Sequence, residues 1–424
     1  MLKKFLVAIS IISIIFSNCF ITSAIAKLPS ENETIIATPG NNEIVALLSG
    51  EIYEFVKDFK KFDSINCNIN QDDVFAPNGV KITWTNKKEG ATSYLFKLST
   101  TSDFKTYTEY NVTETQVVLE DLYVGQIYYY IIEAKYANET ITSSTFSFLT
   151  ASYPRTITID GVSNTRDIGG YITEDGKHRI KQGVAYRGAE LEKMKDSGLQ
   201  KALNTYKIKT ELDLRGNDDT VSAFGENVKL LNYKFPWYSI GGTGINAVEY
   251  KIGLKEGIRA FADKSNFPIF FHCSLGRDRT GTLAFLINAL CGVSEKDLYL
   301  DYELSALSKS GHYDGTEYKV LTKSYFKPLY DYMSLYEGDT YAKKVENFML
   351  ELGITSEEIA AIRENMLDDI VEIPLLALNE SSTDNNIKKT AEKSNSNTLI
   401  IVIIITVTVL IIAGVVILLI AKKK

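Results

Sequence analysis

Cys273 and Arg279 lie six residues apart in the segment His272-Cys273-Ser274-Leu275-Gly276-Arg277-Asp278-Arg279-Thr280-Gly281. The apolar residues 269–271 predict a buried strand before it, and residues 282–290 predict a helix after it. A tight loop between a strand and a helix N-terminus gathers backbone N–H donors around an anion, and a planar guanidinium adds bidentate hydrogen bonds. The segment therefore predicts a phosphate-binding loop, in which the contacts to phosphate come from Arg279 and from Ser274, Leu275, Gly276, Arg277 and Thr280.

The same surroundings determine the chemistry expected of Cys273. A thiol at a helix N-terminus beside arginines ionises far below the ~8.5 of a free cysteine, so we expect a thiolate at neutral pH. This thiolate can attack phosphorus in line and form a thiophosphate intermediate that water hydrolyses. We expect the Thr280 hydroxyl to hydrogen-bond the thiolate and His272 to brace the loop. The alternative of a core cysteine near a surface arginine leaves the surrounding His, Gly and Thr-Gly residues unexplained.

The leaving oxygen needs a proton, and two aspartates compete to supply it. Asp213 ends a predicted strand, where α/β sheets gather catalytic groups, whereas Asp278 lies inside the loop itself. We favour Asp213, because Asp278 has a second possible role in organising Arg277. The chemistry requires no metal and no cofactor, and we expect neither.

The elements around the loop alternate between strands and helices, which predicts an α/β domain over residues 152–372. Strands are expected at 156–159, 184–187, 209–214 and 268–272, with helices at 190–206 and 247–263. The C-terminal half is predicted to be helical, at 298–309, 324–336, 341–352 and after the capping box Thr355-x-x-Glu358.

A different pattern occupies residues 65–151. Short runs of alternating apolar residues at 80–84, 94–98, 117–119, 128–134 and 146–148 predict an antiparallel β-sandwich. The segment resembles a fibronectin type III module, with Trp84 on an early strand and Tyr128 at the corner position. We expect this module to act as a spacer without chemistry.

The two ends of the chain predict export and membrane attachment. Residues 1–26 have the charged, apolar and small-residue regions of a signal peptide, with cleavage expected after Ala26. Residues 27–64 are expected to form a linker, 373–397 a polar stalk, and the uncharged residues 398–421 a transmembrane helix. The lysines at 422–424 then place the rest of the protein outside the cell, on what we expect to be a bacterial surface.

Charge and cysteine content exclude other classes. The 424 residues carry a formal net charge of -7, which argues against a nucleic-acid partner. Beyond the predicted signal peptide only Cys67, Cys273 and Cys291 remain, too few for a disulfide framework, so stability has to come from apolar cores.

Residues 155 to about 370 resemble a bacterial tyrosine-phosphatase family whose loop reads His-Cys-x-x-Gly-Lys-Asp-Arg-Thr-Gly. Further markers match at Asn164-x-Arg166-Asp167-x-Gly169-Gly170, Tyr186-Arg187, Asp213-Leu214-Arg215 and the segment 353–359. The resemblance implies hydrolysis of phosphotyrosine and, as in several members, of phosphoserine, phosphothreonine or phosphoinositides. Arg277 replaces the family's lysine, and Phe235-Pro236-Trp237 lacks the aspartate of the eukaryotic acid loop.

Two alternatives to a protein phosphatase stay open. If Arg166, Arg215 and Arg277 line the site, the substrate is a phosphoinositide or an inositol polyphosphate. If the sandwich carries the function, the protein is a surface adhesion protein with an inactive phosphatase fold.

Overall fold

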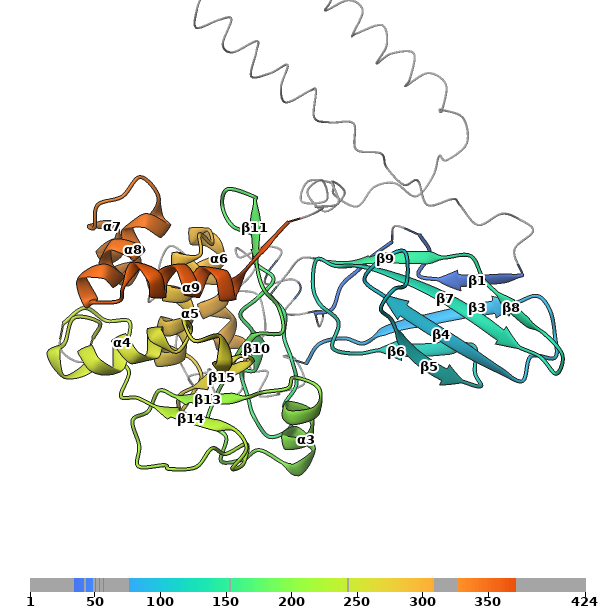
Figure 1. Cartoon of the computed structure of the whole chain (residues 1–424), viewed down its shortest axis with the longest axis horizontal. Coiled ribbons are helices and arrows are strands. Elements are labelled where there is room, and N and C mark those ends of the chain that lie inside the picture. The colour runs from blue at the N-terminus through green and yellow to red at the C-terminus, as the bar shows by residue number, and fades with distance from the viewer. Residues whose placement is uncertain are drawn as a thin grey trace, which may run out of the picture. The chain divides into compact units, whose positions relative to one another are not determined.

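The computed structural model describes residues 34–41, 43–48, 50, 53, 56, 76–151, 154–241, 244–308 and 326–370 (Figure 1). Buried apolar residues in these ranges form one hydrophobic cluster drawn from residues 35–148 and two drawn from residues 157–366. The N-terminal and C-terminal parts of the described chain thus each have cores of their own.

The N-terminal part is built from two β-sheets. One has the strand order β1 (Ile35–Thr38), β3 (Val80–Asn86), β6 (Gln116–Leu119). The other has the order β2 (Glu43–Val45), β9 (Phe146–Thr150), β7 (Ile127–Lys135), β4 (Ser93–Ser99), β5 (Thr108–Val112), with β8 (Thr140–Thr142) paired to β7. Both sheets contribute to one cluster, so this part is a β-sandwich.

The alternating sequence pattern explains the sandwich. Side chains along β7 are alternately buried and half-exposed, as a strand with one face on a core requires. Trp84 lies in the core, with its ring 6.3 Å from that of Phe96. The Tyr123 N–H donates to the hydroxyl of Tyr128 at 2.8 Å, which is the geometry of a tyrosine corner.

The C-terminal part contains a five-stranded sheet. Its order is β10 (Arg166–Asp167), β12 (Ala185–Gly188), β15 (Ile269–His272), β13 (Thr210–Asp213), β14 (Lys229–Asn232). The last four strands run parallel, and β10 is antiparallel to β12. A short ribbon pairs β11 (His178–Ile180) with β16 (Leu367–Asp369). The predicted α/β domain is confirmed in its architecture.

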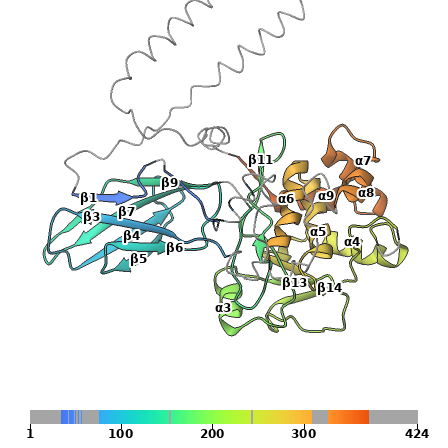
Figure 2. The same cartoon turned by 180° about the vertical axis from the view of Figure 1, so that it is seen from behind.

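Helices cover both faces of this sheet. Phe271, Ile269 and Leu212 face the larger cluster, to which all the described α-helices except α3 contribute; Phe270 and Tyr186 face the smaller one. The smaller cluster includes α3 (Asp196–Asn204). On the larger side lie α4 (Lys251–Arg259), α5 (Asp278–Leu290), α6 (Glu295–Glu303), α7 (Lys327–Ser334), α8 (Tyr341–Leu352) and α9 (Ser356–Met366) (Figure 2). Three short 3-10 helices, η3 (Val248–Tyr250), η4 (Lys264–Asn266) and η5 (Leu304–Leu307), precede or follow these helices along the chain. The predicted helical C-terminal half is confirmed, including the capping box of Thr355 and Glu358.

Two predicted elements were wrong in extent. Residues 156–159 form only isolated bridges, because the chain turns back at Gly161, where the backbone takes φ +84°. The helix expected over 190–206 begins only at Asp196. The backbone N–H groups of Glu190 and Lys195 instead donate to other parts of the chain, at Ser274 and Asp160. Strands β1, β2, β5, β8, β10, β11, β14 and β16 were not predicted, and β1 and β2 come from residues assigned to the linker 27–64.

The predicted signal peptide, most of the linker, the stalk, the segment 398–421 and the lysines at 422–424 lie outside the described residues. Within the described part of the chain, none of the helices has the length and apolar character needed to cross a membrane.

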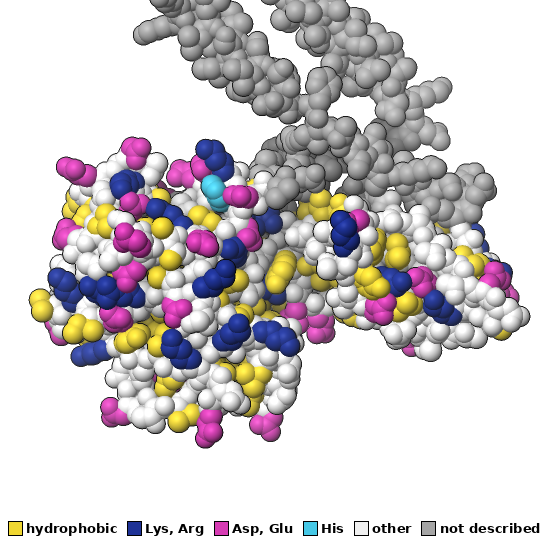
Figure 3. Space-filling view, in the orientation of Figure 1, with side chains coloured by type: hydrophobic (Ala, Val, Ile, Leu, Met, Phe, Trp, Pro, Cys, Tyr) yellow, Lys and Arg dark blue, Asp and Glu magenta, His cyan; other side chains and the backbone are white. Residues whose placement is uncertain are grey.

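Lys and Arg side chains are interspersed with Asp and Glu on the face shown in Figure 3. Among the described residues on that face, they form no continuous basic stripe of the kind that binds nucleic acid.

Candidate active site

Strand register brings the predicted site residues to one edge of the sheet. His272, the last residue of β15, pairs with Gly188 on one side and with Asp213 on the other. Because these strands are parallel, their carboxyl ends lie together, and Cys273 follows directly at that edge. The strand-loop-helix order predicted for the segment is the one observed, with α5 starting at Asp278.

Successive carbonyl groups of the loop are held from outside by other parts of the domain. The Glu190 N–H donates to Ser274 O at 3.2 Å, and Asn164 Nδ2 donates to Leu275 O at 3.0 Å. Arg187 Nη2 donates to Gly276 O at 2.7 Å. In a trans peptide the C=O and the following N–H point in opposite directions. The amides of residues 275–277 therefore point away from these anchors, which is the arrangement an anion cradle needs.

Cys273 lies at the base of this loop and is 3% exposed. It follows the central strand and precedes the N-terminus of the 13-residue helix α5, whose dipole favours negative charge there. The surroundings are those that stabilise an anionic sulfur or a phosphate bound against it.

Gly276 permits the loop to curl. Its φ is +64°, and an added Cβ would lie 2.4 Å from the backbone of Gly188. We expect Gly276→Ala to destabilise the fold by about 1–3 kcal/mol and to lower kcat/KM roughly 100-fold or more, because the loop has to move away from β12. Thermal unfolding and steady-state kinetics measure the two effects.

Gly176→Ala is the matched control for this substitution. Gly176 has a similar φ of +70°, but an added Cβ meets nothing within 4 Å. This variant should show only the backbone strain and keep its activity. Equal activity losses in the two variants would contradict the close approach of loop and strand as the cause.

Arg279 returns to the loop as expected. Its Nη2 donates to Ser274 Oγ at 3.2 Å, and its Nη1 donates to Leu214 O at 3.4 Å. The guanidinium carbon also lies 5.9 Å from the centre of the Trp237 ring. Arg279 thus spans from the end of β13 to the start of the loop, close to where an equatorial phosphate oxygen would bind.

The expected role of Thr280 is not seen. Among the described residues its hydroxyl has no hydrogen-bond partner, and the side chain is fully buried. The predicted bond to Cys273 is therefore not formed in this structure.

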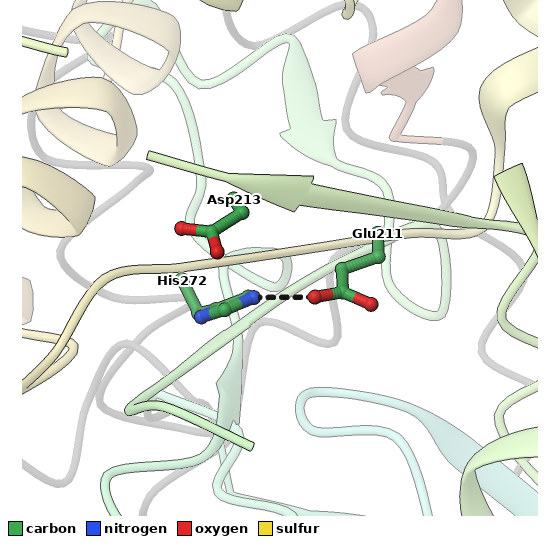
Figure 4. A group of neighbouring side chains, drawn as sticks. All are labelled: Glu211, Asp213 and His272. Atoms are coloured by element: carbon green, nitrogen blue, oxygen red, sulfur yellow. Dashed lines mark hydrogen bonds and ion pairs between the residues drawn. The ribbon is translucent and has the colours of Figure 1, made fainter. Parts of the chain in front are cut away.

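His272 is braced by a neighbouring carboxylate. Its Nε2 lies 2.9 Å from Glu211 Oε1, and Asp213 lies close beside the ring (Figure 4). Glu211 Oε2 accepts from Ser222 Oγ at 2.6 Å and from the Ala223 N–H at 2.7 Å. The bracing role predicted for His272 thus acts through one ring nitrogen.

Glu211, Asp213 and His272 have the composition of a metal-binding set, with candidate ligand atoms within 4.8 Å of one another. However, both oxygens of Asp213 accept hydrogen bonds from Arg215, and both oxygens of Glu211 are engaged as described above. Since every carboxylate oxygen already has a protein donor and a guanidinium lies against the group, we assign it a structural role.

The two candidate acids differ in environment. Burial opposes ionisation of Asp213, but the hydrogen bonds from Arg215 outweigh it and hold the pKa of Asp213 below its ordinary value. Burial raises the pKa of Asp278, although the charge of Arg277 acts against this. Asp278 Oδ1 accepts from the Tyr302 hydroxyl at 3.2 Å. Asp278 is therefore the carboxyl group better suited to carry a proton near neutral pH.

The three arginines expected to bind substrate are engaged with protein groups. Arg166 is fully buried, and its Nε donates to Asp301 at 3.0 Å. The side chain of Arg215 is 16% exposed and forms ion pairs with Asp213 and Glu192. Arg277 is 7% exposed and donates to Tyr302 at 3.1 Å. For Arg166 the prediction of substrate contact is corrected, because the side chain has no exposed surface.

Four residues near the loop were not among the predicted site residues. Asn164 and Arg187 anchor loop carbonyls, Asp301 binds Arg187, and Trp237 lies against Arg279. The family markers already pointed to Asn164 and Arg187. Trp237 was noted only as part of Phe235-Pro236-Trp237, and Asp301 carried no local signal, since its partners Arg166 and Arg187 are distant in sequence.

The C-terminal part of the chain is similar to known phosphatases. The model of the tyrosine phosphatase family matches residues 157–368. A curated protein of Cupriavidus necator, provisionally named a tyrosine-protein phosphatase, is 23% identical over 176 residues, which cover 34% of this chain and 61% of that protein. The chain thus spans about three fifths of the length of this curated relative.

Solved structures with similarity include the catalytic core of the PP-IP phosphatase Siw14 from S. cerevisiae in complex with citrate. It is 17% identical, covers 39% of this chain and 83% of that chain, and has a TM-score of 0.23. An Fn3-like protein from Clostridium thermocellum is 28% identical, covers 18% of this chain and 80% of that chain, and has a TM-score of 0.16.

The family match spans residues 157–368, which are 212 of the 424 residues and contain the whole loop from His272 to Thr280. The chain belongs to the tyrosine phosphatase family.

Proposed function

We propose that this protein is a cysteine-dependent phosphatase that hydrolyses phosphotyrosine, with Cys273 as nucleophile. The observation that carries the proposal is the loop around Cys273, whose carbonyls are anchored outward while Arg279 folds back over it. This geometry offers inward-pointing amides and a guanidinium to one phosphate group.

The reaction proceeds in two displacements. The Cys273 thiolate attacks phosphorus, the P–O bond to the leaving group breaks, and Asp278 protonates the leaving oxygen. Water then attacks the thiophosphate and gives its proton to the Asp278 carboxylate, and the P–S bond breaks. Inorganic phosphate and the thiolate are the products, and Arg279 with the loop amides stabilises the charge on the phosphoryl oxygens in both steps.

The environment of the loop favours a substrate with a single phosphate. A polyanionic head group needs several uncommitted cations, but Arg166, Arg215 and Arg277 each bind a protein group. The phosphoinositide alternative therefore has less support from the structure than it had from the sequence.

Trp237 favours an aromatic substrate. The residue is 39% exposed and lies against Arg279. Its neighbours are fixed, because Phe235 is fully buried and the Tyr238 ring packs 5.0 Å from that of Phe326. An exposed ring held in this way can stack on the ring of phosphotyrosine.

We expect Trp237→Ala to lower kcat/KM for a phosphotyrosyl peptide about tenfold, since an aromatic pair contributes about 0.5–1.5 kcal/mol. The value for a matched phosphoseryl peptide should change little, and Trp237→Phe should retain most of the activity. Equal losses for both peptides would show that the ring supports Arg279 and does not bind substrate.

A substrate panel on the full-length chain tests the proposed function. Phosphotyrosyl, phosphoseryl and phosphothreonyl peptides are compared with soluble phosphoinositides, each with and without vanadate. We expect the phosphotyrosyl peptide to give the highest kcat/KM and vanadate to inhibit it. If phosphoinositides are turned over with the highest kcat/KM, the substrate is a phosphoinositide and not a phosphoprotein. Inactivity on every substrate would support the adhesion alternative.

The N-terminal sandwich and the chain ends complete the proposal. The tyrosine corner of Tyr128 and the buried Trp84 support a fibronectin type III-like spacer. The apolar residues 398–421 support a membrane tether with the catalytic domain outside the cell. Protease accessibility of the catalytic domain on intact cells tests this location.

A further inference from the structure

Two buried arginines and one buried aspartate form an ionic cluster against the outer side of the phosphate-binding loop. Asp301, in helix α6, accepts from Arg166 Nε at 3.0 Å through one carboxylate oxygen and from Arg187 Nη1 through the other. Both guanidinium groups are fully buried. The three side chains together carry a net charge of +1 in the interior of the domain.

The cluster reaches the loop by two routes. Arg187 donates through Nη2 to Gly276 O at 2.7 Å while its Nη1 is held by Asp301. Asn164 donates through Nδ2 to Leu275 O at 3.0 Å while its Oδ1 accepts from Arg166. The side chains that anchor Leu275 O and Gly276 O are therefore themselves held within the cluster.

Fixing these carbonyls also fixes the amides beyond them. The peptide planes that carry Leu275 O and Gly276 O also carry the N–H groups of Gly276 and Arg277, which point the opposite way. A loop whose planes are held before substrate arrives needs no reorganisation when charge develops on the phosphoryl group.

We propose that Asn164, Arg187 and Asp301 are positioning residues that hold the phosphate-binding loop open for its anion, an inference that rests on the proposed phosphatase function. In the bonds described, Asn164 and Arg187 donate to loop carbonyls and Asp301 holds Arg187, so the three act through the orientation of the loop amides. Burial and the charge of Arg166 lower the pKa of Arg187 to about 10, with Asp301 and Cys273 acting in the opposite direction. Arg187 therefore keeps its charge at neutral pH.

Arg187→Lys and Asn164→Gly test this proposal in the full-length chain. The lysine keeps the charge but cannot bridge Asp301 and Gly276 O with one planar fork. The glycine tolerates the backbone at residue 164, where φ is +58°, and removes only the amide. The readouts are the rate of iodoacetamide alkylation of Cys273 against pH, followed by peptide mass spectrometry, and the inhibition constant of inorganic phosphate.

We expect each variant to lower the alkylation rate at pH 6 about tenfold and to weaken phosphate inhibition about tenfold, the loss typical of one hydrogen bond to a charged group. Arg155→Lys is the matched control. Arg155 is also buried and is paired with Asp167 at 2.8 Å, but contacts no residue of the loop in the bonds described. It should lower the melting temperature and leave both readouts unchanged.

The outcomes separate this proposal from the function on which it rests. If wild-type Cys273 reacts at pH 6 as slowly as a free thiol, the phosphatase mechanism fails whatever the variants do. If the wild type reacts fast and both variants match it, the positioning role is wrong. If Arg187→Lys does not fold, Asn164→Gly by itself tests the positioning role, because this variant leaves Arg166, Arg187 and Asp301 in place.

Discussion

Cys273→Ser is expected to lower kcat on a phosphotyrosyl peptide on the order of 10⁴-fold or more. A serine hydroxyl is not ionised near neutral pH, so the loop would hold the phosphate without a nucleophile to attack it. The geometry of the loop should survive, because its carbonyl anchors come from Glu190, Asn164 and Arg187 and do not involve the sulfur. The variant should therefore still bind substrate, measured by isothermal titration with the same peptide.

Cys291→Ser is the matched control. Cys291 is the other free cysteine among the described residues and caps the opposite end of helix α5. It is buried, and burial raises the pKa of its thiol to about 12, so it has no part in nucleophilic chemistry. This variant should keep its activity. A Cys273→Ser protein that retains even a hundredth of wild-type kcat would refute a covalent mechanism through this sulfur.

The loop was predictable because its signals are local. Strand, cysteine, glycine, arginine and helix follow one another within residues 269–290, and each constrains the same short stretch of backbone. The alternating strands of the sandwich were predictable for the same reason, since the burial pattern of β7 is already visible as apolar alternation in the sequence.

What holds the loop depends on contacts between distant segments. Asp301 follows Arg166 by 135 residues and Arg187 by 114 residues, so no spacing rule connects them. A sequence reading places each arginine near the site but cannot tell a substrate-binding cation from one that is paired and buried. The buried ion pair with Asp301 gives Arg166 a structural role. At residues 190–195 the hydrogen bonds of Glu190 and Lys195 to distant segments override the local helix propensity.

The choice between the two acids also depends on such contacts. Position at a strand end favoured Asp213, but the strand register sets that residue beside His272 and the next turn folds Arg215 back onto it. An aspartate held below its ordinary pKa by a guanidinium is already ionised at neutral pH and has no proton to give.

Asp278→Asn is therefore expected to lower kcat/KM roughly 10²–10⁴-fold on a phenyl phosphate with a poor leaving group. The effect should be much smaller on 4-nitrophenyl phosphate, whose leaving group needs little protonation. Asp213→Asn should weaken the hold on Arg215 and lower both rates by a similar factor. A loss confined to the poor leaving group in Asp213→Asn, and not in Asp278→Asn, would restore Asp213 as the acid.

The pH dependence gives an independent check on Asp278. Because burial raises its pKa, the protonated form persists to higher pH than for an ordinary aspartic acid. Activity on the poor leaving group should fall as pH rises through that raised pKa, while activity on 4-nitrophenyl phosphate should not follow it. In Asp278→Asn this fall in activity at high pH should disappear, since asparagine has no proton to lose. A fall that persists unchanged in the variant would show that another group causes it.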